Sequence, residues 1–245
     1  MARREEKLPA QDVAVEKSRF LLWLENYWYH YKWHTIVALF FAFTLLFCLV
    51  QCVKKEEADL LVVVAGDIAF PESDARDAFV TAFAANAPEN QKGEKMKVEV
   101  SHYTIFSPEQ MRALSTDDAG EFSPSMESAL KLSSQTEYDA FTSFRMTGES
   151  CVYLVSDYVY ENSNLKEYAV PLSELFESLP ESALDDYSVR FSDLDFCNYY
   201  SAFGILPQDF RLLLTKPLVV GKASKADVYA AYTALFCNLV TFEAP

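Results

Sequence analysis

The sequence predicts an α/β protein in which one N-terminal transmembrane helix precedes a single, mostly parallel-sheet domain flanked by helices. Three observations support this fold class. Residues 33–53 carry no charged side chain. Residues 59–65 form a continuous aliphatic and β-branched run, which is typical of a strand buried on both faces of a parallel sheet. Further strand-like runs alternate with helix-start signals along the chain, as expected for α/β folds.

The uncharged stretch would form a helix about 30 Å long, which matches the hydrocarbon core of a bilayer. The residues before it are rich in aromatic side chains, which prefer the headgroup layer because one end of each ring finds water. A soluble amphipathic helix over residues 18–33, packed on the protein itself, is the alternative interpretation. The predicted membrane-interface residues are Trp23, Tyr27, Trp28, Tyr29, Tyr31 and Trp33.

Basic residues are more numerous before the span than after it, so the positive-inside rule predicts a cytoplasmic N-terminus. Within the nearest residues the margin is three against two, which leaves the inverted orientation as an alternative. More than thirty residues precede the span and no Ala-x-Ala follows it, so an uncleaved signal anchor fits better than a cleaved signal peptide. The predicted parts are a cytoplasmic tail and aromatic flank (1–32), a transmembrane helix (33–53), a stalk (54–57) and an extracytoplasmic domain (58–245).

The acidity of the chain resides in the large domain. Residues 58–245 hold 13 basic and 29 acidic residues, a net charge of −16. This charge disfavours nucleic-acid binding and favours solubility and a cationic partner, although a solvated acidic surface has the same composition. The length of this domain, 188 residues, suits a single hydrophobic core. Cys151, Cys197 and Cys237 lack CxxC spacing, which argues against zinc; Cys197 and Cys237 are either free thiols or a pair.

The elements of the domain follow from periodicity and capping signals. The strand at residues 59–65 precedes a helix that opens at Ser73, and residues 96–103 alternate as a strand nearer a sheet edge. Ser107 and Ser123 each precede a proline, which marks two further helix starts. The remaining expected elements are a helix over 136–148, a strand at 151–155, short helices after 157 and 171, strands at 188–191 and 210–215, and a terminal helix over 224–240.

Catalytic motifs are weak in this sequence. His102 is the only histidine in the domain, and a single histidine in an alternating strand is usually structural. The scattered glycines form no phosphate-binding loop. The pairs Asp185/Asp186 and Asp193/Asp195 lack the ligand spacing of a calcium loop. We therefore expect no enzymatic activity, no bound metal and no cofactor.

A binding crevice is expected where strands end, since ligands of open α/β sheets bind beyond the carboxyl ends of the strands. Ordinary strand exits and helix caps are the alternative explanation for the same residues. The candidate ligand-binding residues are Gly66, Asp67, Tyr103, Thr104, Ser156 and Asp157.

Residues 144–157 read FRMTGESCVYLVSD, and a Pro-Leu segment at 171–175 leads into a short helix. This order resembles bacterial extracytoplasmic solute-binding proteins of the type II periplasmic class, although 188 residues imply that one of the two lobes is reduced. The segments YHYKWH (29–34) and YSVRFS (187–192) are similar to uncharacterised single-pass membrane proteins of Gram-positive bacteria. The resemblance implies a solute-binding-like domain and carries over no ligand residue.

These inferences lead to three functional hypotheses. The first is a membrane-anchored, extracytoplasmic, non-enzymatic domain that binds a small solute or another envelope protein. The second is an extracytoplasmic enzyme that uses carboxylates such as Asp67, Asp157 or Asp193. The third is a subunit of a membrane complex that acts through its transmembrane helix, with Cys48 or Cys52 packed against a partner helix.

Overall fold

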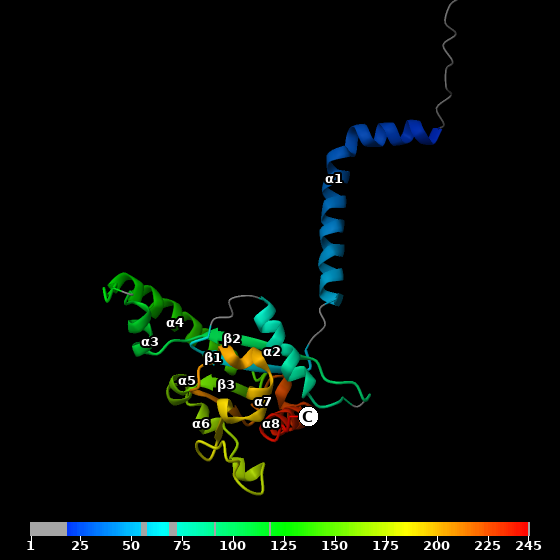
Figure 1. Ribbon diagram of the computed structural model, residues 1–245. Helices are drawn as coiled ribbons and strands as arrows, with labels where there is room; N and C mark the ends of the chain where they lie inside the picture. The colour runs from blue at the N-terminus through cyan, green and yellow to red at the C-terminus, as the bar shows by residue number, and fades with distance from the viewer. Residues whose placement is uncertain (1–18, 55–57, 69–72, 91, 118, 245) are drawn as a thin grey trace, which may run out of the picture. The chain divides into compact units, whose positions relative to one another are not determined.

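The computed structural model describes residues 19–54, 58–68, 73–90, 92–117 and 119–244 (Figure 1). The predicted tail up to residue 18 and the stalk residues 55–57 lie outside the described residues. The chain divides into two compact units, 1–57 and 58–245, which are described separately below.

The first unit contains one continuous helix, α1 (Arg19–Lys54). Its stretch Leu22–Leu49 is 28 residues long, has a mean hydropathy of 1.8 and is not buried, so it is long and apolar enough to cross a membrane. Figure 1 shows a sharp bend within this helix. The Thr35 hydroxyl donates to the Tyr31 carbonyl at 3.0 Å, a contact that often bends helices. No helix break separates the aromatic flank from the predicted span.

The second unit is an α/β domain around an open five-stranded sheet with the strand order β2-β1-β3-β5-β4. The strands are β1 (Leu60–Gly66), β2 (Val98–Thr104), β3 (Val152–Ser156), β4 (Ser188–Arg190) and β5 (Phe210–Leu214). The helices are α2 (Ser73–Ala85), α3 (Pro108–Leu114), α4 (Pro124–Arg145), α5 (Asp157–Asn162), α6 (Leu165–Tyr168), α7 (Asp195–Tyr199) and α8 (Ala226–Val240). Short 3-10 helices are η1 (Leu172–Glu174), η2 (Phe191–Asp193), η3 (Ser201–Ile205) and η4 (Lys222–Ser224).

The predicted α/β class is confirmed, but the sheet is mixed rather than mostly parallel. β1 pairs in parallel with β2 and with β3, whereas β5 runs antiparallel to both β3 and β4. Apart from Arg211, β5 consists of buried apolar residues, as β1 largely does, so its local pattern did not reveal its direction. A two-lobed solute-binding protein would divide into two compact units with a cleft between them. Residues 58–245 form one compact unit instead.

The sheet separates two cores. On one face α2, α8, η2, α7 and η3 cover Val62, Val64 and their neighbours, and on the other α4, α5 and α6 cover Val63 and Ala65 (Figure 1). Period-two alternation in β1 therefore sends successive side chains into different cores. The first core contains an aromatic cluster in which the rings of Phe79 and Phe203 lie 4.6 Å apart.

Helix starts agree closely with the capping signals. Ser107 and Gln110 form a complete capping box at α3, and the Ser123 hydroxyl accepts from the Met126 backbone N–H at α4. The helix expected over 136–148 is the second half of α4, because no residue between 124 and 145 interrupts the helix. Gly148 lies two residues after Met146, the C-cap of α4, and has a φ of +68°, in the left-handed region that favours glycine.

Candidate functional site

The carboxyl ends of β1, β2 and β3 meet at one edge of the sheet because these strands are parallel. Gly66 pairs with Thr104 there, and Ser156 pairs with Phe210. Since β5 runs in the opposite direction, its first residue lies at this edge. We call this part of the domain the acidic edge, after the three aspartates that lie directly outside the neighbouring strands: Asp67, Asp157 and Asp209.

Gly66 is a packing residue rather than a ligand-binding one. A Cβ atom at this position would lie 2.6 Å from Cζ of Phe210 and 2.9 Å from Cβ of Ser156. The absence of a side chain therefore lets the Phe210 ring close over the end of β1. This contact holds β5 against the acidic edge and fixes the position of the residue before Phe210.

The Asp67 carboxylate is hydrogen-bonded to another side chain through one of its two oxygens. The Gln110 side-chain amide of α3 donates to Oδ2 of Asp67 at 2.5 Å, while Oδ1 is buried and has no hydrogen-bond partner among the described residues. Burial and then the negative charge of Asp209 raise the pKa of the Asp67 carboxyl, against the lowering effect of hydrogen bonds from its own backbone and from Gln110. One oxygen of this group thus has unused acceptor capacity.

The Asp209 carboxyl resembles that of Asp67 in its burial and its raised pKa. Its Oδ1 is also buried and unpartnered within the described part of the chain. Burial raises the pKa of this carboxyl most, and the charge of Asp157 raises it further, whereas nearby backbone N–H groups and Arg190 lower it. The sequence-based prediction missed Asp209 because it considered only residues that follow parallel strands. The signal was its position directly before the buried run at 210–215.

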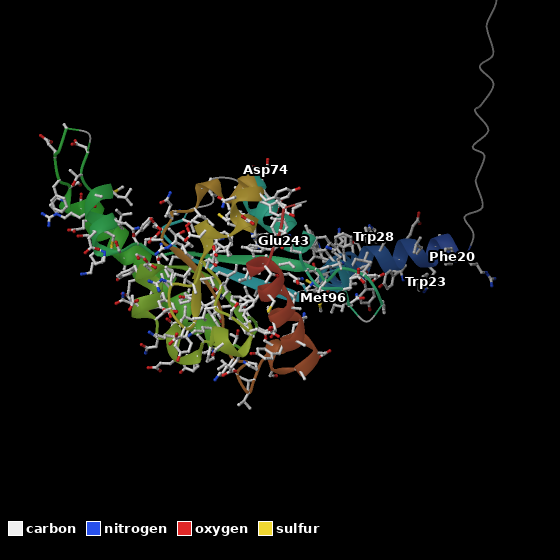
Figure 2. All side chains as sticks on the ribbon, turned by 60° about the horizontal axis from the view of Figure 1, so that its bottom comes forward. Phe20, Trp23, Trp28, Asp74, Met96 and Glu243 are labelled. Atoms are coloured by element: carbon white, nitrogen blue, oxygen red, sulfur yellow. The ribbon has the colours of Figure 1, made fainter. Side chains whose placement is uncertain are left out.

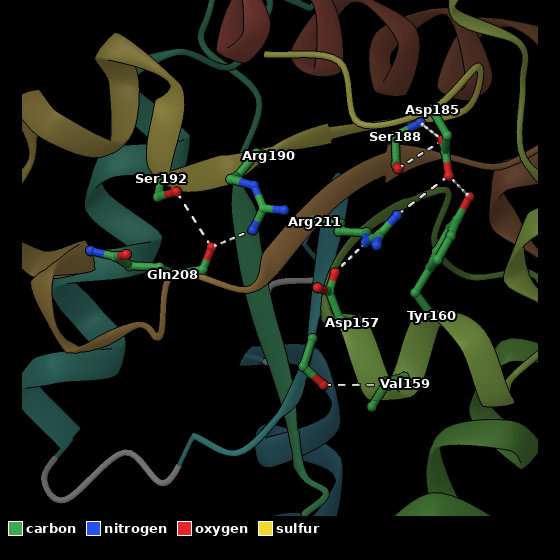
Figure 3. A network of polar contacts seen from close by, with 10 residues as sticks. Asp157, Val159, Tyr160, Asp185, Ser188, Arg190, Ser192, Gln208 and Arg211 are labelled. Carbon is green, nitrogen blue, oxygen red and sulfur yellow. Dashed lines mark hydrogen bonds and ion pairs between the residues drawn. The ribbon is translucent and has the colours of Figure 1, made fainter. Parts of the chain in front are cut away.

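Asp157, by contrast, already has a cationic partner (Figure 3). Its Oδ1 forms an ion pair with Nε of Arg211, and Nη1 of the same arginine lies 3.4 Å from Oδ2 of Asp185. The Arg211 guanidinium lies 4.7 Å from the ring centroid of Tyr160, on whose face it is stabilised. Arg211 is largely buried, so this network binds three parts of the chain to each other. None of these three contacts of Arg211 was predicted.

Asp185 completes that network. It accepts hydrogen bonds from the Tyr160 hydroxyl at 2.8 Å and from the backbone N–H groups of Tyr187 and Ser188. Burial alone would raise its pKa, but these bonds and the Ser188 hydroxyl outweigh burial and hold the pKa of the carboxyl below its usual value. Asp185 therefore links Tyr160, Arg211 and the start of β4 through one carboxylate.

The other predicted crevice residues have structural contacts. Tyr103 packs its ring against Phe141, with centroids 5.6 Å apart, and so belongs to the second core. The Thr104 hydroxyl donates to the Ile68 carbonyl at 2.8 Å, which ties β2 to the segment after β1. The Ser156 hydroxyl accepts from the Val159 N–H and caps α5. Among the six predicted residues, Asp67 is the one with a buried side-chain oxygen that lacks a hydrogen-bond partner within the described residues.

Metal and catalytic constellations are sparse in the described residues. No group of three or more His, Cys, Asp and Glu side chains there could hold a metal ion. His102 lies within β2, and burial, then the charge of Arg76, lowers its pKa against the opposing effect of Glu137. Asp193 lines a shallow hollow beside Asp195 instead of joining the acidic edge. The described Cys48, Cys151, Cys197 and Cys237 are free, so the possible pair of the sequence analysis is not formed.

The aromatic flank forms a ladder along α1. The rings of Trp23 and Tyr27 stack at 5.6 Å, and those of Tyr27 and Tyr31 at 5.4 Å. Phe20, Trp23 and Trp28 follow one another along the N-terminal part of the helix (Figure 2). The remaining predicted interface residues are exposed as well: Trp28 51%, Tyr29 74% and Trp33 70%. Large aromatic surface outside any core is what an interfacial position requires.

No protein-family model, curated protein or solved structure matches this chain. The resemblance to solute-binding proteins and to Gram-positive single-pass membrane proteins therefore stays a prediction, and the site must be interpreted from its own chemistry.

Proposed function

We propose that this chain is a single-pass membrane protein whose residues 58–245 form an extracytoplasmic, non-enzymatic binding domain. In this proposal α1 anchors the chain, the N-terminus is cytoplasmic, and the acidic edge binds a cationic or N–H-rich group. That group belongs either to a small solute or to a segment of another envelope protein.

One observation carries the assignment of the site. Two neighbouring carboxylates, Asp67 and Asp209, each keep one buried oxygen without a partner among the described residues. Buried polar atoms in folded proteins are nearly always hydrogen-bonded, and exceptions require a reason. A ligand that donates to both oxygens would be such a reason, because it would satisfy the two atoms and reduce the repulsion between the two carboxylates.

The chemistry of the ligand follows from these groups. Ionised carboxylates only accept hydrogen bonds, so the complementary group is an ammonium, a guanidinium or an amide N–H. A cationic donor fits best because charge-assisted hydrogen bonds are about twice as strong as neutral ones. Asp157 is a poorer candidate for binding this cation, because its carboxylate already pairs with Arg211. Asp67 and Asp209 are therefore the proposed ligand-binding pair.

The enzymatic alternative has one observation in its favour. The pKa values of Asp67 and Asp209 are both raised, as a general acid requires. Of the three carboxylates in that hypothesis, however, Asp157 is paired with Arg211 and Asp193 lies in a different hollow. A purified chain that hydrolysed ester, peptide or glycoside substrates and lost this activity on Asp67→Asn would replace the binding function with an enzymatic one.

The binding function is tested by calorimetric titration of the full chain in detergent micelles with spermidine, choline and arginine amide. We expect heat of binding with at least one of these cations at pH 7. The signal should be lost in the double variant Asp67→Asn/Asp209→Asn, because both acceptor charges are removed. It should also weaken as the pH falls through the raised pKa values of the two carboxyls.

The matched control is Asp193→Asn, which removes one carboxylate from the exposed surface of the same domain. This variant should bind as the wild type does. Absence of binding for all three cations, or equal binding by the double variant, contradicts the proposed function.

A further inference from the structure

The opposite edge of the sheet carries an exposed apolar loop between two lysines. β5 ends where β1 and β3 begin, and residues 216–222 follow it with the sequence KPLVVGK. We call Leu218, Val219 and Val220 the apolar tip. Val219 is 97% exposed and Val220 60% exposed. Neither valine belongs to either of the two cores.

The apolar tip extends onto other exposed side chains. Leu218 lines a small hollow together with Met146, Tyr168 and Arg145. Met146 is 60% exposed and Tyr168 41% exposed. The exposed surface is therefore a patch formed by three separate segments of the chain, and patches of this kind mark interaction sites.

Backbone contacts hold the loop in place at both ends. Lys216 N–H donates to the Tyr168 carbonyl at 2.7 Å, and Ala223 N–H donates to the Gly148 carbonyl at 3.0 Å. Gly148 and Gly221 approach so closely that a Cβ on Gly148 would lie 2.0 Å from the Val220 carbonyl oxygen. Both glycines have positive φ angles. The valines are thus presented on a constrained loop and lose little conformational entropy on binding.

The charge around the apolar tip differs from that of the whole domain. Residues 216–226 contain three lysines, Lys216, Lys222 and Lys225, and no acidic residue, although the domain has a net charge of −16. Lysine side chains beside exposed aliphatic ones suit a membrane surface, where the ammonium groups meet anionic headgroups and the aliphatic groups enter the acyl boundary.

The apolar tip is linked to the start of the domain. The Lys222 ammonium donates to the carbonyl of Ala58, the first described residue of the domain. In the sequence, only residues 55–57 separate Ala58 from Lys54, the last residue of α1. The lysine-flanked loop therefore contacts the part of the domain that follows α1 in the sequence.

We infer that the apolar tip is a second membrane contact, which inserts Val219 and Val220 into the surface of the bilayer that α1 spans and selects anionic lipid through Lys216 and Lys225. The inference rests on the anchoring part of the proposed function.

The test uses the full chain reconstituted into phosphatidylcholine vesicles with and without phosphatidylglycerol. An environment-sensitive fluorescent amino acid replaces Val219, which avoids the native cysteines. The matched control places the same residue at Ile205, which is 47% exposed and ends η3, outside the apolar tip. We expect a blue shift of the emission at position 219, larger with phosphatidylglycerol, and none at position 205. Lys216→Gln/Lys225→Gln should remove the dependence on phosphatidylglycerol.

Vesicle flotation separates the two possible failures. If the chain floats after alkaline washing but the emission at position 219 equals that at position 205 in both lipids, the second contact is wrong and the anchor stands. If the chain does not float, the anchoring itself is wrong and the inference falls with it.

Discussion

Asp209→Asn should stabilise the domain at neutral pH. The wild-type carboxylate has one buried oxygen without a partner among the described residues and lies near the charges of Asp67 and Asp157. Burial and the neighbouring charges disfavour the ionised form of this carboxyl in the folded state, and each unit of pKa difference corresponds to about 1.4 kcal/mol. Because Asp209 is partly exposed, solvent screening limits the cost to about 1 kcal/mol. The amide cannot ionise and keeps the shape of the side chain, so the free energy of unfolding should rise by about 1 kcal/mol.

The effect should depend on pH in a defined direction. The folded-state pKa of Asp209 is raised above its unfolded value, so the folded state binds the proton more tightly. The ionised group therefore destabilises the fold most at pH values above the folded-state pKa. As the pH falls through that pKa toward 3.8, the wild type gains stability and its difference from the Asn variant shrinks.

Amide hydrogen exchange of β1 and β3 peptides is the suitable assay. All three tryptophans lie between residues 23 and 33, so tryptophan fluorescence would report on α1 rather than on the domain. Core strands exchange through global unfolding, and 1 kcal/mol corresponds to about fivefold slower exchange. Exchange at pH 7 that is as fast as in the wild type, or faster, would refute the description of Asp209 as a carboxylate whose charge destabilises the fold.

Three further changes test the fold around the site by the same measurement. Phe203→Ala should destabilise the domain by about 3–5 kcal/mol, since its ring fills the aromatic cluster under the sheet; a loss below 1 kcal/mol would contradict this packing. Gly66→Ala should cost about 1–3 kcal/mol through its clash at the end of β1, whereas Gly204→Ala, with open space around it, should be neutral. Arg211→Met should destabilise the domain at pH 7, because it leaves the ionised Asp185 carboxylate without its cationic partner. The pKa of Asp185 lies below its usual value, so the destabilisation should disappear only as the pH falls through that lowered pKa. A loss of stability that does not depend on pH would contradict the ion pair.

Much of the fold could be predicted because its elements have strong local signals. The run at 59–65 is uniformly aliphatic and forms a strand between two others. Residues 96–103 alternate in polarity and form an edge strand. The Ser-Pro pairs at 107 and 123 are followed by helices. In each case the physical cause acts within one element, so a window of a few residues contains it.

Strand direction and long-range pairing could not be predicted in the same way. A buried antiparallel strand such as β5 has the same apolar composition as a buried parallel one, since both faces of each are covered. The site depends on this direction. Asp67 and Asp157 were predicted because they follow parallel strands, whereas Asp209 and Arg211 reach the same edge only because β5 runs backward. Their role depends on the neighbouring strand and not on adjacent residues.

The most direct test of a cation-binding acidic edge is retention of the natural ligand. The full chain and its Asp67→Asn/Asp209→Asn variant would be purified under mild conditions from membranes of the native host, and bound small molecules and peptides would be identified by mass spectrometry. The account predicts an amine-bearing or guanidinium-bearing molecule or segment with the wild type and its loss in the double variant. Equal retention by both proteins, or a ligand without a cationic or N–H donor group, would contradict it.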